Sequence, residues 1–132
     1  MIHLDTSVLI DALTGPRRSA RALRQLLSGP EPVAVSSIVL FEWLRGPRSP
    51  RENEAREALF PSADCAPFGF LEAHIASHLY KTLKRARGRE ADLAIAACAL
   101  AAGASFWTLN ANDFRDIPNL TLWKPDENAD KN

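Results

Sequence analysis

Four acidic residues stand at points in the chain where a charged side chain is energetically costly. Asp5 directly follows the apolar run Ile2–Leu4, and Glu42 interrupts an otherwise apolar segment. Asp92 lies at the start of an alanine-rich segment, and Asp113 comes just after another short apolar run. A carboxylate that faces a protein core costs several kcal/mol unless it is paired or hydrogen-bonded. Carboxylates that converge also repel one another, so they require protons or a cation between them.

Oxygen ligands without a neighbouring His or Cys favour a hard divalent cation, Mg²⁺ or Mn²⁺. Such a cation lowers the pKa of a bound water, orients a phosphate and neutralises the leaving oxygen. The four acids therefore predict metal-dependent hydrolysis of a phosphate ester.

Each acid also has a purely structural interpretation. Asp5 could cap the helix that follows it, and Asp92 in a first helical turn would favour the helix dipole. Glu42 could pair with Arg45 three residues on, and Asp113 could cap a turn. Four such roles at corresponding points of one alternating pattern would be an unusual coincidence, so we favour the shared site.

Apolar runs that alternate with helical segments are expected to position these acids. Five strands are predicted, at 2–4, 33–35, 63–68, 105–109 and 120–123. Helices are predicted between them, at 7–12, 17–27, 38–44, 50–59, 69–87 and 90–102. This alternation implies right-handed crossovers and a parallel sheet covered on both faces, which is a three-layer α/β/α fold. In such sheets a ligand site lies at the carboxyl ends of the strands, where Asp5 is expected.

Length and composition fit one domain. The 132 residues are expected to form a single domain over 1–124, followed by a polar tail over 125–132. The 16 basic and 16 acidic residues cancel, so any polyanion must be attracted by a local patch. Cys65 and Cys98 are far apart in apolar segments, which favours free thiols over a disulfide or a zinc site. No signal peptide or membrane span is expected, and the cytoplasm is the default location.

Four motifs, in this order, resemble those of the PIN-domain ribonucleases, specifically the VapC-type toxins of toxin–antitoxin pairs. They lie at 4–10, 37–46, 92–97 and 108–114, and each contains one of the four acids. The resemblance runs over nearly the whole chain, from Leu4 to Trp123. Each motif alone is weak, whereas the ordered set in a chain of this length is specific.

The resemblance implies a parallel sheet in the order 3-2-1-4-5 and an acidic pocket that holds one or two Mg²⁺ or Mn²⁺ ions. It also implies an RNA endonuclease that forms homodimers and binds a small antitoxin, which blocks the site. By position, the acidic set would comprise Asp5, Glu42, Asp92 and Asp113. Asp5, Asp92 and Asp113 would be metal ligands, although the fourth acid varies in this family, and Glu42 would act through water. Polar residues that support the pocket would be Thr6, Thr108 and Asn110.

Local cations must attract RNA to an acidic pocket on a chain without net charge. Arg87 and Arg89 lie a few residues before Asp92, so we expect them to flank the pocket and contact the RNA backbone. The arginines at 17, 21 and 24 offer an alternative path. The basic run before Asp92 could instead be solvated or stabilise a helix C-terminus.

Other phosphate-handling α/β proteins fit the sequence less well. A phosphatase of the haloacid-dehalogenase type would need a second Asp where Ser7 stands, and a receiver domain would need an acid pair that His3-Leu4-Asp5 does not offer. No glycine-rich phosphate loop is present. The remaining alternative is a non-catalytic interaction domain whose acids bind only a structural metal ion.

Overall fold

Three short parallel strands form the centre of the molecule: β1 (Ile2–Leu4), β2 (Val33–Ala34) and β3 (Ser105–Trp107). The computed structural model describes residues 1–126 and places β1 between the other two strands. β1 pairs in parallel with both neighbours. All three residues of β1 are buried, as expected for a strand that is covered on both faces.

Two isolated bridges extend the sheet at its edges. Ala66 bridges to Ser36 just after β2, and Leu122 bridges to Phe106 in β3. From edge to edge, the segments therefore follow the third, second, first, fourth and fifth predicted strands, which confirms the order 3-2-1-4-5.

The outer segments are shorter than the full strands predicted at 63–68 and 120–123, so those two predictions are wrong in extent. Ser62–Asp64 forms the short 3-10 helix η1 instead, and after the bridge the N–H of Phe68 donates to the side-chain hydroxyl of Ser37 at 3.1 Å and not to a backbone carbonyl. At the other edge, β3 ends at Trp107, so the segment beside it pairs only once.

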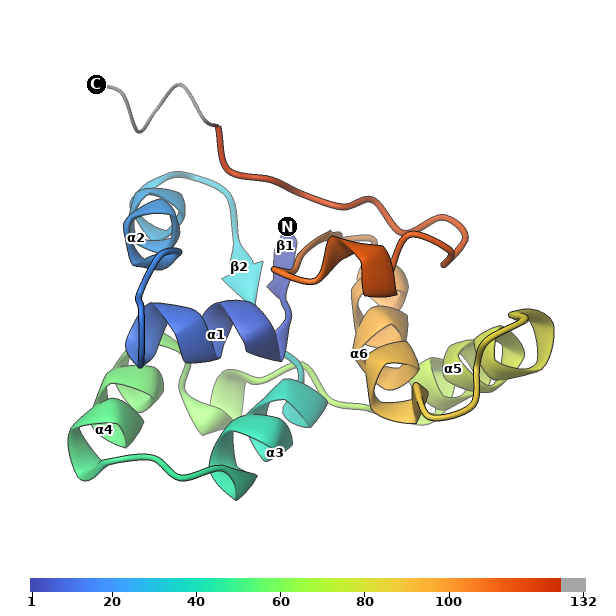
Figure 1. The fold of residues 1–132 in the computed structure, drawn as a ribbon, viewed down its shortest axis with the longest axis horizontal. Helices are drawn as coiled ribbons and strands as arrows, with labels where there is room; N and C mark the ends of the chain where they lie inside the picture. The colour runs from blue at the N-terminus through green and yellow to red at the C-terminus, as the bar shows by residue number, and fades with distance from the viewer. Residues whose placement is uncertain (127–132) are drawn as a thin grey trace.

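Within residues 1–126, six helices surround the strands: α1 (Thr6–Leu13), α2 (Ala20–Ser28), α3 (Ser37–Arg45), α4 (Pro50–Leu59), α5 (Phe70–Thr82) and α6 (Glu90–Ala101). Figure 1 shows α1, α2 and α4 on one side of the strands and α5 and α6 on the other. Helix α3 contacts both α1 and α6. This arrangement confirms the predicted α/β/α fold. None of the helices within 1–126 is long and apolar enough to cross a membrane.

Two helix boundaries differ from those predicted by more than one residue. Helix α2 begins at Ala20 and not at Arg17, because Arg17 has a left-handed backbone with φ of 57°. Helix α5 ends at Thr82 and not at position 87, because the next residue is extended and the chain then turns Ala86 into the core. The break at Gly88 is confirmed, since its φ of 84° suits glycine. The predicted polar tail, 125–132, lies mostly outside the described residues.

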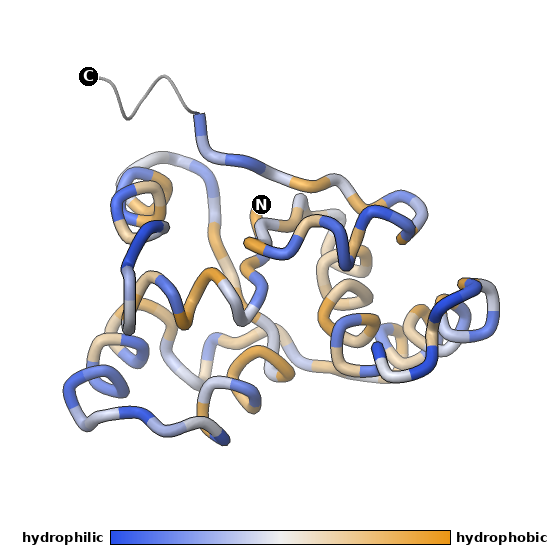
Figure 2. Tube along the Cα trace, in the orientation of Figure 1, coloured by the Kyte–Doolittle hydropathy of each residue, from blue (hydrophilic) through white to orange (hydrophobic). Residues whose placement is uncertain are grey.

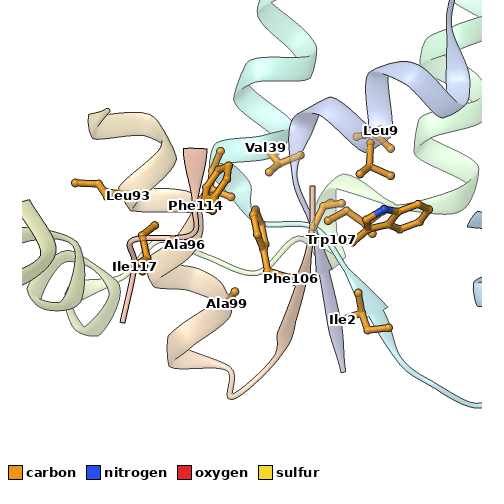
Figure 3. Close-up of a cluster of buried hydrophobic side chains, with 14 of the residues drawn as sticks. Ile2, Leu9, Val39, Leu93, Ala96, Ala99, Phe106, Trp107, Phe114 and Ile117 are labelled. Atoms are coloured by element: carbon orange, nitrogen blue, oxygen red, sulfur yellow. The ribbon is translucent and has the colours of Figure 1, made fainter. Parts of the chain in front are cut away.

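Helix α6 occupies the centre of the core. Ala96 and Ala99 are fully buried, and Figure 2 shows the helix as predominantly hydrophobic. In Figure 3 both alanines lie in the same cluster as Phe106 and Phe114, whose ring centroids are 4.8 Å apart. Small side chains allow α6 to pack against α3, α5 and β3 together, which confirms the central position predicted from its alanine content.

A larger side chain inside this helix should therefore destabilise the fold. We expect Ala96→Leu to lower the free energy of unfolding by about 1–3 kcal/mol, because an added isobutyl group must displace packed neighbours. Ala91→Leu is the matched control, since Ala91 is exposed on the same helix and leucine is a good helix former. Urea unfolding of both variants measures the difference. Equal stabilities would contradict the close packing of α6.

Candidate active site

Asp5 is placed by the first strand and held by hydroxyl groups from two elements. Its backbone N–H donates to the carbonyl of Trp107 at 2.8 Å, which continues the pairing of β1 with β3. Oδ2 accepts the hydroxyl of Ser7 at 2.8 Å and that of Thr108 at 2.7 Å. Its side chain makes no hydrogen bond that caps α1. The structural alternative of a capping side chain is therefore wrong for Asp5.

Glu42 comes from the middle of α3, and its two oxygens have different partners. Oε1 accepts the hydroxyl of Thr6 at 2.6 Å, so the first residue of α1 fixes one edge of the carboxylate. Oε2 lies 3.2 Å from Nη2 of Arg45, which is the pair three residues apart that the sequence suggested. Glu42 therefore makes its local ion pair and still faces the residues around Asp5.

Asp92 lies in the first turn of α6 and makes the third wall of the site. Burial, and after it the negative charges of Asp5, Glu42 and Asp113, together raise its pKa to about 6, while Arg89 acts in the opposite direction. Burial also raises the pKa of Asp5, a shift that the hydroxyls of Thr108 and Ser7 oppose. The electrostatics show that these acids lie close enough to repel one another.

One open pocket of about 480 Å³ contains three of the four predicted acids. Its lining comprises Asp5, Thr6, Ser7, Ile10, Glu42, Arg45, Gly46, Arg48, Asp92 and Asn110. Thr6 and Asn110, the polar residues expected to support the site, thus lie in its lining. Thr108 supports it from behind, because its hydroxyl bonds to Asp5 and accepts the N–H of Asn110 at 3.0 Å.

Asp113 lies beside this pocket and not in its lining. It ends the 3-10 helix η2 (Ala111–Asp113) and borders two neighbouring hollows, one with Arg115 and one with Arg89. Its charge still raises the pKa of Asp92. Direct metal ligation by Asp113 stays a prediction.

The predicted RNA-contacting arginines also lie outside the pocket lining. Arg89 forms a two-pronged ion pair with Asp116, both distances being 2.8 Å, and its Nη2 donates to the carbonyl of Asp113 at 2.7 Å. These bonds tie the start of α6 to η2, so Arg89 has a structural role. Arg87 is exposed. Contact of either residue with RNA stays a prediction.

Sequence reasoning did not assign five of the lining residues to the site: Ser7, Ile10, Arg45, Gly46 and Arg48. Ser7 bonds both Asp5 and the N–H of Leu109, at 3.1 Å, so it joins the ends of β1 and β3. Its position two residues after Asp5 was the available signal. Gly46 and Arg48 enter through the turn after α3; Gly46 is the last residue of the second motif, whereas Arg48 lies outside all four motifs.

The comparison with known proteins agrees with this geometry. The family model for the PIN domain matches residues 2–120. The chain belongs to the PIN-domain family. Ribonuclease VapC19 of Mycobacterium tuberculosis is 32% identical over 119 residues, which cover 89% of this chain and 94% of that protein. The resemblance to the VapC-type branch of PIN domains is thereby confirmed.

Two solved structures have a similar fold. VapBC2 of Rickettsia felis, bound to a promoter DNA fragment, matches with a TM-score of 0.75 at 25% identity, covering 96% of this chain and 100% of that one. A toxin–antitoxin complex of Klebsiella pneumoniae matches with a TM-score of 0.69 at 27% identity, covering 92% and 96% of the two chains.

The chemistry of the PIN-domain pocket fits a divalent cation. All its acidic donors are carboxylate oxygens, and the repulsion that raises the pKa of Asp92 would be relieved by positive charge. Within residues 1–126, no three His, Cys, Asp or Glu side chains form a ready-made metal site. Mg²⁺ commonly binds through one or two carboxylates and keeps several waters, so two acids are enough.

The raised pKa of Asp92 predicts how the free energy of unfolding of the metal-free protein, measured in a chelator, changes with pH. Its pKa is about 6 in the folded protein against an ordinary value of 3.8, so the folded state binds the proton more tightly. Protonated Asp92 therefore stabilises the fold fully below its pKa in the unfolded state. This stabilisation is lost as the pH rises through its pKa in the folded state. Between about pH 4.5 and about pH 7, the wild type should lose on the order of 1 kcal/mol relative to Asp92→Asn, after discounting for solvent screening.

Urea unfolding of both proteins at each pH measures this difference. Buried His3 has a lowered pKa and gives the opposite trend at acid pH, but it is present in both proteins and cancels. A difference between the two proteins that stays constant with pH would contradict the repulsion inferred for the pocket.

Proposed function

We propose that this PIN-domain protein is a Mg²⁺- or Mn²⁺-dependent endoribonuclease and the toxin of a toxin–antitoxin pair. The observation that carries the proposal is the convergence of Asp5, Glu42 and Asp92, from three distant segments, on one open pocket. An open pocket admits a polymer from the side, which an internal cut requires. The similarity to ribonuclease VapC19 supports RNA as the substrate, and single-stranded or looped RNA would present an accessible backbone.

In this proposal Asp5 and Asp92 hold the metal directly, Glu42 acts through water, and Asp113 supplies a fourth negative charge. The bound metal would activate a water and neutralise charge on the phosphate and leaving oxygen. The remaining residues orient these groups. Ser7 and Thr108 fix the carboxylate of Asp5, as Thr6 does that of Glu42. Two hydroxyls on one oxygen of Asp5 also limit rotation of its carboxylate.

The first test is the metal dependence of RNA cleavage by the purified protein. We expect cleavage of a single-stranded RNA with Mg²⁺ or Mn²⁺ and none in excess chelator, because the carboxylates cannot replace the cation. Gel analysis of end-labelled RNA measures the cuts. Undiminished cutting in chelator would refute the metal mechanism, and no cutting with either ion would favour the non-catalytic interaction domain.

The second test removes single charges from the pocket. Asp5→Asn and Asp92→Asn should each reduce kcat/KM by at least about 100-fold, the scale expected when a key electrostatic group is lost. Both variants should stay folded, because asparagine has nearly the same shape and relieves repulsion. Asp64→Asn is the control, since Asp64 is exposed and outside the pocket. Unfolding of either pocket variant would instead show that its acid is structural.

Partner proteins follow from the same proposal. Large apolar side chains are exposed on two helices, with Phe41 and Leu44 on α3, and Phe70 and Leu71 on α5. Exposed apolar groups of this kind suit binding of an antitoxin and of a second copy of the chain. An antitoxin could place an Arg or Lys against the pocket carboxylates.

Co-expression with a small protein encoded by the neighbouring gene tests this partnership. We expect the two proteins to co-purify and the complex to show little nuclease activity, because the partner would cover the acidic pocket. Light scattering of the isolated toxin would give its oligomeric state. Separate elution of the two proteins would count against the toxin assignment while leaving the nuclease intact.

A further inference from the structure

Two arginines line the acidic pocket, and they differ in what holds them. Arg45 is largely exposed, pairs with Glu42, and has its guanidinium carbon 5.5 Å from the ring centroid of Phe41. Arg48 is half-buried, and among the residues that the structure describes it has no carboxylate partner. Arg45 therefore already pairs with an acid of the site, whereas Arg48 forms no ion pair with a carboxylate of the described residues.

The guanidinium of Arg48 is held against an aromatic ring. Its central carbon lies 4.6 Å from the ring centroid of Trp43, and Nη1 donates to the carbonyl of Pro47 at 3.2 Å. Trp43 is itself fixed, because it is fully buried and its indole N–H donates to Asn53 at 2.9 Å. The Nε atom of Arg48 is buried without a hydrogen-bond partner. The cation is thus partly desolvated and preorganised, which strengthens its interaction with an anion.

The backbone around Arg48 is stiff. Pro47 precedes it, and Ser49-Pro50 follows as the capped start of α4, where Ser49 and Glu52 form a capping box. Proline fixes its own φ and restricts the residue before it, and both Gly46 and Ser49 are extended as expected before proline. The turn between α3 and α4 therefore presents Arg48 at a fixed place.

Gly46 makes room for this arrangement. A Cβ atom added at Gly46 would lie 2.7 Å from Nη2 of Arg48. The φ of −87° and ψ of 168° at this position are accessible to alanine, so the glycine is needed for space and not for backbone freedom. Gly46→Ala should therefore displace the guanidinium without straining the turn.

We propose that Arg48 binds a backbone phosphate of single-stranded RNA at the edge of the acidic pocket. The inference rests on the proposed ribonuclease function and adds a substrate-positioning residue to it. An unpaired, fixed guanidinium beside carboxylates that repel RNA offers the planar, two-pronged geometry that matches a phosphate. Arg48 would thus guide the RNA backbone toward Asp5 and Asp92 without taking part in the reaction itself.

The test measures binding of a short unstructured RNA in the Asp92→Asn background, which should bind without cutting. Arg48→Ala should weaken binding at least about tenfold and lower the slope of log affinity against log salt by about 0.7, the loss of one single-strand phosphate contact. Two further variants separate position from charge. Gly46→Ala should weaken RNA binding with little change in urea unfolding. Arg48→Lys should give an intermediate affinity, because lysine keeps the charge but lacks the two-pronged guanidinium.

In the active protein, Arg48→Ala should raise KM more than it lowers kcat.

Arg51→Ala is the matched control, since Arg51 is exposed on α4, does not line the pocket and belongs to neither basic group considered for the RNA path. An equal loss of binding in this control would show a general charge effect and overturn the inference. An unchanged salt slope in Arg48→Ala would overturn it while leaving the ribonuclease intact. Absence of RNA binding and of cleavage in the parent protein would refute the proposed function and the inference together. If Arg48→Ala binds RNA normally but no longer forms the complex with the protein encoded by the neighbouring gene, Arg48 belongs to a protein interface and the inference is overturned.

Discussion

Mutual repulsion among carboxylates is the constraint on which the rest of this structure depends. Asp5, Glu42 and Asp92 face one pocket, and burial together with their shared negative charge raises the pKa of Asp92 to about 6. Such an arrangement costs stability, so the packing elsewhere must offset it. The close contact of α6 with its neighbours, made possible by its buried alanines, supplies that packing beside the site.

The parallel sheet brings the acids together because its strands end at a common edge. Asp5 follows β1, while Thr108 follows β3 and donates its hydroxyl to Asp5 at 2.7 Å. Ser7 spans the same two strand ends through Asp5 and Leu109. The hydroxyls favour the ionised form of Asp5 against its burial, so the polar residues around the acid are part of its electrostatic balance.

The arginines that the structure places near the site differ in whether an ion pair already engages them. Arg89 joins α6 to η2 through Asp116 and the carbonyl of Asp113, and Arg45 pairs with Glu42. Arg48 rests on Trp43 without an acidic partner in the described part of the chain. Closeness in sequence to Asp92 therefore did not indicate which arginine faces the pocket. Arg89 lies close to Asp92 in sequence, but it is paired with Asp116.

The sequence by itself determined the alternation of strands and helices and three acids that share a pocket, while the order of the strands was implied only by the resemblance to PIN-domain ribonucleases. The alternation follows from local apolar runs, and the shared site from the rule that the strands of a parallel sheet carry ligands at their carboxyl ends. Only the tertiary structure decided that α5 stops at Thr82, that Asp113 lies beside the pocket, and that Arg48 enters it. Each depends on contacts between residues far apart or on a turn whose course local propensity does not fix. Helix α5 stops because Ala86 turns into the core, and Asp113 lies beside the pocket because Arg89 binds its backbone carbonyl. Arg48 enters the pocket because Gly46 leaves space for its guanidinium over the buried ring of Trp43.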